Sequence, residues 1–392
     1  MKRILFPIIF LSTLLSFSQN IEIKPYVEYL NKIEKKSAKD YILEKFKTHD
    51  IVILCERHHD EFSQYELIKE IISDNSFKKN VKNLFTEAGL INQYPELTNF
   101  LKKKGLDSSF VHNKLVEFQR NSSFWFTSDH SNYHYLLKTI YNLNNNSESQ
   151  INYISADVEF DWSKVKDSND FYNEMEYETE PRDSIMAYNI INCLNKIKAP
   201  NSQKALVIMN YRHAFKIHTK SNNGTSQNVG KYLTDYYGDR VASILINQTY
   251  FKGNDNKLIQ NGKWDAALKY LDIENIGFDF SNSIFGKDIL DMWEINQPYT
   301  YRDAFDGFVF YNPLEVFYLA SGVKGLVPKT FEKELIRRTR ITLEYQKRIE
   351  FLKKLEDENF KKAFFKDLNT KRIKKYPDSD FIIKERDKYL ND

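Results

Sequence analysis

Near its amino end the chain reads Ile51-Val52-Ile53-Leu54-Cys55-Glu56-Arg57-His58-His59-Asp60-Glu61, so four apolar residues and a cysteine run directly into six ionisable residues. A short apolar, β-branched run predicts a buried strand of a parallel sheet, and the abrupt change marks the carboxyl end of that strand. Ligands of open α/β sheets bind at this edge. Glu56 and His59 are three residues apart, so a tight turn would pair them. A carboxylate beside an imidazole makes the imidazole a better base.

Three later segments repeat this pattern of an apolar run followed by ionisable residues. The runs are 81–85, 151–155 and 205–209, and the residues that follow them are Glu87, Asp157 and His213. Because the carboxyl ends of parallel strands meet at one edge of a sheet, these side chains are expected to gather there with Glu56 and His59. The sequence therefore predicts one ionisable cluster on one edge of one sheet.

The residues between the apolar runs have helical periodicity. Helices are predicted over 62–72, 95–104, 109–120, 133–143 and 229–237, within 19–48 and 158–198, and from Pro181 onward. Further strands are predicted over 241–246, 276–280 and 308–311. Strands that alternate with helices are typical of an α/β fold. We therefore predict a mainly parallel β-sheet core flanked by helices, with helical insertions and a helical C-terminal extension.

The amino terminus has the composition of a secretory signal peptide. Met1-Lys2-Arg3 precedes an apolar run over 4–17, and Ser16-Phe17-Ser18 has the small-x-small pattern of a cleavage site. The alternative is an uncleaved anchor, but the run is shorter than the roughly 20 residues that a membrane span needs. We therefore expect a signal peptide over 1–18, a periplasmic or secreted protein, and a mature chain without a membrane span.

Composition divides the remaining chain into two expected domains. Residues 19–328 form the α/β domain, and residues 329–392 form a charged helical extension with 19 Lys+Arg against 13 Asp+Glu. The whole chain has a net charge of +3, and its main body lacks the basic stripe with interleaved aromatics that would indicate a nucleic-acid partner. Two cysteines, Cys55 and Cys193, make neither a disulfide scaffold nor a thiolate zinc site. Cys55 is expected to be a small buried hydrophobe rather than a nucleophile.

The motifs, taken in order, resemble the erythromycin-esterase/ChaN-like superfamily, whose wider relatives include Tiki/TraB-type proteins. The pieces that carry the resemblance are Leu54–Asp60, the strand-end Glu87, the helix start Arg182–Asn189 and the strand end Val207–Ala214. They span about residues 50 to 310, and the tail after residue 328 is not covered. The resemblance implies a parallel α/β core with helical insertions and a cleft at the strand ends.

The resemblance also implies roles for particular residues. His59 corresponds to the general base of the esterase branch, with Glu56 beside it, and His58 is a rival because some branches place this histidine one residue earlier. Glu87 corresponds to a second carboxylate of the cleft. Arg182 corresponds to a helix arginine that points into the cleft, and His213 to the late histidine. Asp183, next to Arg182, is assigned no chemistry, because the helix dipole alone favours an acid in a first turn.

The chain departs from the family pattern at two positions. Cys55 stands where the family has a glycine before the glutamate. Asn210 stands where the esterase branch often has a further histidine, three residues before His213. The first departure adds a Cβ where a ligand would approach the backbone. The second removes a histidine that belongs to the macrolide esterases.

Three functions follow from these residues. The first is a hydrolase of small-molecule esters or related bonds, in which His59 activates water and His213 or Arg182 stabilises the oxyanion. The second is a metal-dependent hydrolase, because oxygen and nitrogen ligands for a divalent ion come from Glu56, His59, Glu87, Asp157 and His213. The third is a haem- or iron-binding protein, as the ChaN branch implies, with Tyr211 or His213 as the iron ligand. Substrate and oligomeric state stay open.

Overall fold

The structure is a computed structural model that describes residues 21–122, 131–175, 181–197, 203–221, 224–252, 255–292 and 298–390. The expected signal peptide, 1–18, lies outside these residues. Within these ranges, no helix has both the length and the apolar character that crossing a bilayer requires.

A seven-stranded sheet organises the chain. Its strands are β1 (Ile51–Glu56), β2 (Asn83–Leu90), β3 (Asn152–Asp157), β4 (Ala205–Asn210), β7 (Val241–Ile246), β10 (Asn275–Asp279) and β11 (Gly307–Tyr311). Their order across the sheet is β10-β11-β7-β1-β4-β2-β3, and every neighbouring pair is parallel except β10–β11. The predicted mainly parallel α/β fold is confirmed.

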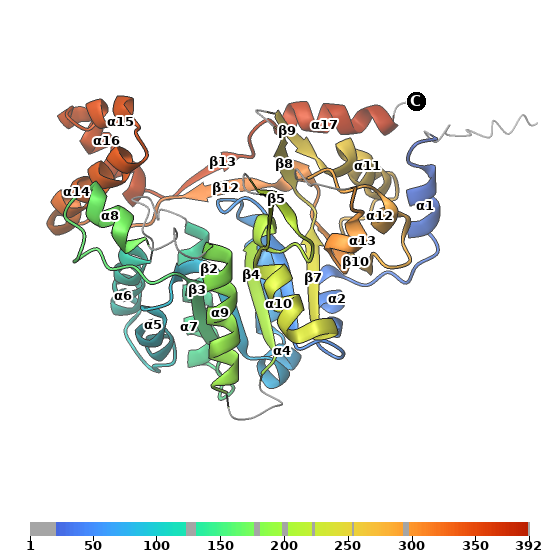
Figure 1. Ribbon diagram of the computed structural model, residues 1–392, viewed down its shortest axis with the longest axis horizontal. Coiled ribbons are helices and arrows are strands. Elements are labelled where there is room, and N and C mark those ends of the chain that lie inside the picture. The colour runs from blue at the N-terminus through green and yellow to red at the C-terminus, as the bar shows by residue number, and fades with distance from the viewer. Residues whose placement is uncertain are drawn as a thin grey trace, which may run out of the picture.

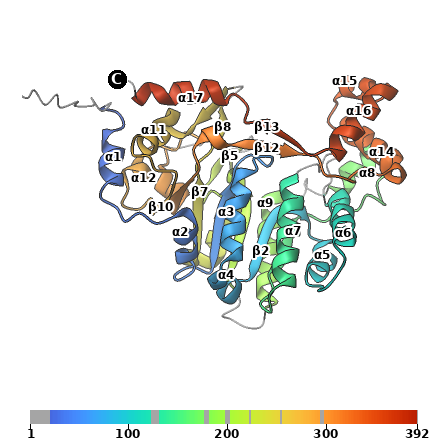
Figure 2. The ribbon, with the colours of Figure 1, turned by 180° about the vertical axis from the view of Figure 1, so that it is seen from behind.

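Helices cover both faces of this sheet. In Figure 1 the nearer face carries α9 (Arg182–Asn195) and α10 (Val229–Tyr237), and Figure 2 shows α2 (Ala38–Lys45), α3 (Ser63–Ser73) and α7 (Ser131–Asn145) on the other. Alternate residues of β1 divide between the two cores, since Ile53 packs with the α9 side and Leu54 with the α3 side. A strand that is buried on both faces has a continuous run of apolar residues. This is why the apolar run over 51–55 identified β1 in the sequence.

The other elements of the body are shorter or lie at its periphery. They are the helices α1 (Lys24–Leu30), α4 (Asn75–Asn80), α5 (Tyr94–Leu101), α6 (Ser108–Asn121), α8 (Ser168–Glu174), α11 (Lys263–Tyr270), α12 (Ile284–Lys287) and α13 (Tyr301–Ala304), and the strands β5 (Thr219–Ser221), β6 (Gly224–Ser226), β8 (Thr249–Lys252), β9 (Asp255–Leu258) and β12 (Tyr318–Ser321). The predicted helical segment 19–48 is therefore two helices, α1 and α2.

Strand β2 differs from its prediction at both ends. It begins at Asn83, because Lys82 has a positive φ of 66°, a conformation that a regular strand does not allow. It continues to Leu90 through a register shift after Thr86. Its pairing with β4 also stops at Thr86. Glu87 therefore lies inside an irregular part of the strand, beyond the last pair with β4.

The C-terminal extension is mainly helical, with α14 (Lys329–Tyr345), α15 (Ile349–Lys354), α16 (Glu358–Asn369) and α17 (Ser379–Asp387), and it also contains β13 (Arg372–Lys375). Strand β13 pairs with β12 in an antiparallel ribbon, which in Figure 1 runs between the α14–α16 helices at one end of the molecule and α17 at the other. Strand β13 was not predicted, because one apolar residue, Ile373, gives no hydrophobic pattern in the sequence. In the structure Ile373 is 65% exposed.

Strand β12 also holds the segment that follows β1. The backbone N–H of Phe62 donates to the carbonyl of Tyr318 (2.9 Å), and the N–H of Ala320 donates to the carbonyl of Asp60 (3.0 Å). An isolated bridge joins Glu61 to Leu319 between them. The loop that carries His58 and His59 is thus held by β12, a strand near the carboxyl end of the α/β domain in the sequence.

Candidate active site

A buried arginine anchors the loop that carries His58 and His59. Arg57 Nη1 donates to Glu61 Oε2 (2.9 Å), and its Nε and Nη2 donate to the carbonyl and the side-chain oxygen of Asn247 (2.7 Å each). The guanidinium lies 3.8 Å from the centre of the Phe317 ring. Because Arg57 and Glu61 are both fully buried, this ion pair is held in one geometry. The residues on either side of Arg57 are therefore positioned by the fold.

Glu56 and His59 form the pair that their spacing predicted. His59 Nδ1 lies 2.9 Å from Glu56 Oε2, and the other oxygen of Glu56 accepts a hydrogen bond from the hydroxyl of Tyr65. The Tyr133 hydroxyl lies 3.2 Å from the same ring nitrogen, and Asn132 donates to the His59 carbonyl. A carboxylate at Nδ1 favours the tautomer in which Nε2 carries the lone pair.

Glu87 lies between the two histidines of the cluster. Its Oε1 is 3.3 Å from Nε2 of His59 and 3.8 Å from Nε2 of His213. Its Oε2 accepts the backbone N–H of Asn210 at 2.7 Å, so the carboxylate takes up a donor at the end of β4 that β2 leaves unpaired. The irregular end of β2 thus brings Glu87 to the place where β1 and β4 both end.

A second carboxylate–histidine pair mirrors the first. His213 Nδ1 is hydrogen-bonded to Asp183 Oδ1, so its Nε2 is the nitrogen that faces Glu87. Asp183, for which the sequence predicted no role, is the hydrogen-bond partner of His213. The only sign of this contact in the sequence was the position of Asp183, in the first turn of a helix that was expected to begin at the edge of the cleft.

Arg182 lies at the cleft as the resemblance implied, but it is held by an acid of the cluster. Its Nε and Nη2 donate to the two oxygens of Asp157, at 2.8 and 2.7 Å. A bidentate arginine–carboxylate pair fixes the plane of both groups. Asp157 is therefore bound to Arg182. The possible metal ligands that lie closest to one another are other residues.

The charges of the cluster shift one another's protonation. Burial alone would lower the pKa of His59, but the carboxylates of Glu56 and Glu87 outweigh it and hold the pKa of His59 well above its usual range. Burial likewise opposes a raised pKa at His213, and Glu87 and Asp183 overcome it. Burial would raise the pKa of Glu87, yet His213 and His59 hold this pKa well below its usual range. Two histidines whose protonated forms are favoured therefore flank a carboxylate whose ionised form is favoured.

These residues line a cavity of about 340 Å³, within the size range of small-molecule sites. Its polar lining consists of His58, His59, Glu87, Arg182, Asn210, Arg212 and His213, and the remaining wall consists of Tyr211, Thr249, Tyr250, Phe251 and Tyr376. Glu56 and Asp157 lie behind this lining.

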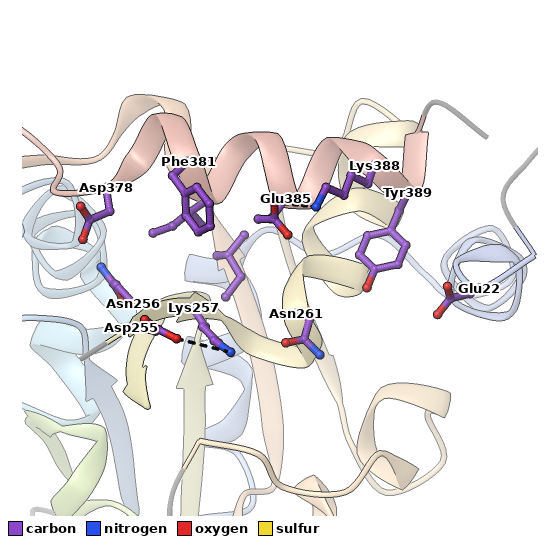
Figure 3. A pocket seen from close by; sticks show the side chains of 12 residues that line it. Glu22, Asp255, Asn256, Lys257, Asn261, Asp378, Phe381, Glu385, Lys388 and Tyr389 are labelled. Carbon is purple, nitrogen blue, oxygen red and sulfur yellow. Dashed lines mark hydrogen bonds and ion pairs between the residues drawn. The ribbon is translucent and has the colours of Figure 1, made fainter. Parts of the chain in front are cut away.

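A larger pocket of about 770 Å³ lies elsewhere, between α17 and β9. Figure 3 shows Phe381 and Glu385 on the α17 side and Asp255, Asn256 and Lys257 on the other. None of the residues that line it belongs to the histidine cluster. We therefore place the candidate active site at the smaller cavity, where the ionisable groups converge.

The two departures from the family pattern have structural explanations. Cys55 points into the apolar core beneath the α9 face, with its sulfur 4.0 Å from Ser243 Oγ, and not toward the cavity. The Asn210 side chain accepts from the N–H of Arg212 (3.2 Å) and donates to the carbonyl of Arg57 (3.2 Å). It joins the ends of β1 and β4 instead of offering a second imidazole.

The burial of Cys55 leads to a prediction about thiol chemistry. Burial raises the pKa of its thiol, and a protonated, inaccessible sulfur is inert. Iodoacetamide should leave Cys55 unmodified in the native protein and label it after unfolding in urea, as mass spectrometry of the peptide would detect. Cys55→Ala should keep any hydrolytic turnover within about twofold of the parent, because an inert thiol takes no part in chemistry. Labelling of native Cys55 with loss of turnover would contradict this.

One group of possible metal ligands is present among the described residues. Single ligand atoms of Glu56, His59 and Glu87 all lie within 4.8 Å of one another. Two carboxylate oxygens and an imidazole nitrogen suit a divalent cation. Of the five candidates from the sequence, Asp157 and His213 lie outside this group.

Fold and site together define an α/β protein with two carboxylate–histidine pairs at the carboxyl edge of a parallel sheet. No family model and no curated protein matches the chain. Among solved structures, a succinoglycan biosynthesis protein is 11% identical with a TM-score of 0.46, over 76% of this chain and 97% of that one. A mutant of the erythromycin esterase EreC in an open conformation is 10% identical with a TM-score of 0.44, over 75% and 97%. The haem-binding ChaN of Campylobacter jejuni is 14% identical with a TM-score of 0.36, over 58% and 92%.

Proposed function

We propose that the chain is an exported hydrolase in which His59 activates water against an ester or related bond of a small molecule. The observation that carries the proposal is the pairing of His59 Nδ1 with Glu56 at 2.9 Å, which leaves Nε2 next to Glu87 on the cavity wall. A histidine oriented in this way is the usual general base of a hydrolase.

In this proposal His59 and His213 each perform one step. His59 Nε2 takes a proton from water as the water oxygen attacks the ester carbonyl, and later returns it to the leaving alkoxide. His213, whose charge Glu87 and Asp183 favour, stabilises the oxyanion that forms. It suits this role better than Arg182, whose Nε and Nη2 are engaged by Asp157.

The first experiment is a panel of ester substrates on the purified mature protein, with and without chelator. Turnover that resists the chelator supports His59 acting on water directly. Absence of turnover on every ester contradicts the proposal, and a haem titration monitored at the Soret band then tests the binding function that the ChaN resemblance raised.

The raised pKa of His59 gives the pH dependence its direction. A base works only when neutral, so turnover in chelator should rise with pH and reach half its plateau above pH ~6.5, the usual value for histidine. Glu87→Gln removes one of the two carboxylates that hold the proton, so the midpoint should move toward acid. The ion pairs of His59 stabilise the fold below pH ~6.5, and this stabilisation is lost as pH rises through the raised value. A rate that is flat from pH ~5 to 8 contradicts the role of His59.

A second candidate is a metal-dependent hydrolase, favoured by the compact group of Glu56, His59 and Glu87. A bound divalent ion would supply Lewis-acid activation of water. In that case a chelator should abolish turnover, and Zn²⁺ or Mn²⁺ should restore it and raise the melting temperature of the protein. Glu56→Gln should remove the thermal shift, whereas Asp157→Asn should keep it, because Asp157 lies outside the group. Equal shifts in all three proteins would contradict a site at these residues.

A further inference from the structure

The cavity has a second wall that the proposed reaction does not use. Beside the ionisable residues stand Thr249, Tyr250 and Phe251 from β8 and Tyr376 from the C-terminal extension. Tyr250, Phe251 and Tyr376 contribute aromatic rings to this lining, which indicates a surface for the non-reacting part of a ligand.

Tyr376 is held rigidly in this wall. It directly follows β13, whose pairing with β12 fixes the backbone. Its hydroxyl lies 2.8 Å from Thr249 Oγ1, and its ring meets the Phe317 ring edge-on at 5.7 Å between centres. The side chain is buried in an apolar cluster that also contains Ile382 of α17. Its hydroxyl is satisfied by Thr249, and Tyr376 contributes to the cavity lining from this fixed position.

Phe251 supplies the accessible half of the same wall. Its side chain is 51% exposed, although it lines a cavity. Its neighbour Tyr250 is buried, with its hydroxyl held by Asp291 Oδ2 at 3.0 Å, so the strand that presents Phe251 is anchored. An apolar ring placed against Phe251 would remove this surface from water, which is favourable, and rings pair best in offset or edge-on contact.

We propose that the segment after Lys329 completes the active site, and that Tyr376 and Phe251 form an aromatic wall that binds an apolar ring of the substrate beside His59 and Glu87. The substrates are then esters or related compounds that carry an apolar ring near the reacting carbonyl. The reaction itself rests on the proposed function, whereas the binding surface stands on the geometry of the cavity.

The test measures binding directly, with three carboxylates that mimic the acid product. Phenylacetate offers a ring, hexanoate a chain of comparable size, and acetate neither; each is titrated into the full chain by calorimetry. Phenylacetate should bind about 10-fold more tightly than acetate, in line with one aromatic contact, and more tightly than hexanoate. Phe251→Ala should remove most of this preference and leave acetate binding as it was.

Matched variants separate the wall from the stability of the fold. Phe381→Ala removes an exposed phenylalanine (63%, against 51% for Phe251) of α17 that lies outside this cavity, and it should change no affinity. Tyr376→Phe keeps the ring and should keep the preference, whereas Tyr376→Leu should weaken phenylacetate binding. Circular dichroism reports whether Tyr376→Leu is folded, and Phe251→Ala, at a half-exposed site, decides the matter if it is not.

The outcomes distinguish this inference from the proposed function. Equal affinity for phenylacetate and acetate, or a preference that survives Phe251→Ala, would overturn the aromatic wall. Hexanoate binding as tight as phenylacetate would overturn its selectivity for a ring. Methyl phenylacetate and methyl acetate are assayed in parallel. If neither is hydrolysed, the proposed function fails, while the calorimetric result still decides whether the wall binds rings.

Discussion

Replacing His59 by alanine should lower turnover of a responsive ester by about 10²–10⁴-fold, the range that a positioned acid–base group contributes. The variant loses the nitrogen that takes the proton from water and leaves Glu56 without its partner. Steady-state kinetics would show the loss in kcat, with a smaller change in KM, because His59 acts on the transition state. Added imidazole should restore part of the rate if His59 acts as a base.

A matched control for this variant exists at the other end of the same strand. His49 precedes β1, at the amino edge of the sheet, and is hydrogen-bonded to the Lys45 carbonyl at 3.1 Å. His49→Ala should leave kcat unchanged. A His59→Ala protein that retains parent turnover would remove His59 from the mechanism and return attention to His213.

Replacing Arg57 by methionine should lower the free energy of unfolding by about 3–5 kcal/mol, the usual cost of removing one partner from a buried ion pair. The cost arises because Glu61, fully buried, keeps its charge without the guanidinium. The same variant should lose turnover beyond what unfolding explains, since the loop with His59 is anchored through Arg57 to Asn247. Urea unfolding followed by circular dichroism measures the first effect.

Two further variants separate burial from charge. Arg240 pairs with Asp50 at 3.0 Å on the surface, so Arg240→Met should cost less than about 1 kcal/mol. The double variant Arg57→Met/Glu61→Leu leaves no uncompensated charge and should be more stable than Arg57→Met alone. Equal losses in Arg57→Met and Arg240→Met would show that the buried pair contributes no more than an exposed one.

The sequence was sufficient wherever a residue's position in the fold follows from its place on a strand. The run at 51–55 located β1, and the parallel register that pairs Glu56 with Asn210 explains why residues far apart in the chain meet at one edge. The spacing of Glu56 and His59 likewise predicted their contact. These inferences depend on local pattern and on the rules of parallel sheets, both of which a single sequence carries.

Contacts that depend on tertiary packing were beyond the sequence. Asp183 resembled an ordinary acid of a first helical turn, and only the packing of α9 against β3 and α10 shows that it binds His213. Tyr376 lies in a charged tail outside the resemblance, and it reaches the cavity through β13, whose exposed residues give no hydrophobic signal. The position of Glu87 was right, but the irregular strand that places it there was not foreseen.

The pairing of β12 with β13 also bears on the order in which parts of the structure can form during synthesis. A ribosome makes the chain from its amino end, so the sheet strands β1 to β11 are available long before Arg372–Lys375 emerges. Strand β12, which is hydrogen-bonded to the loop that carries His59, can pair with β13 only at that late stage. The strands of the sheet can therefore pair before the β12–β13 ribbon forms, and Tyr376, which directly follows β13, reaches the cavity only with that ribbon.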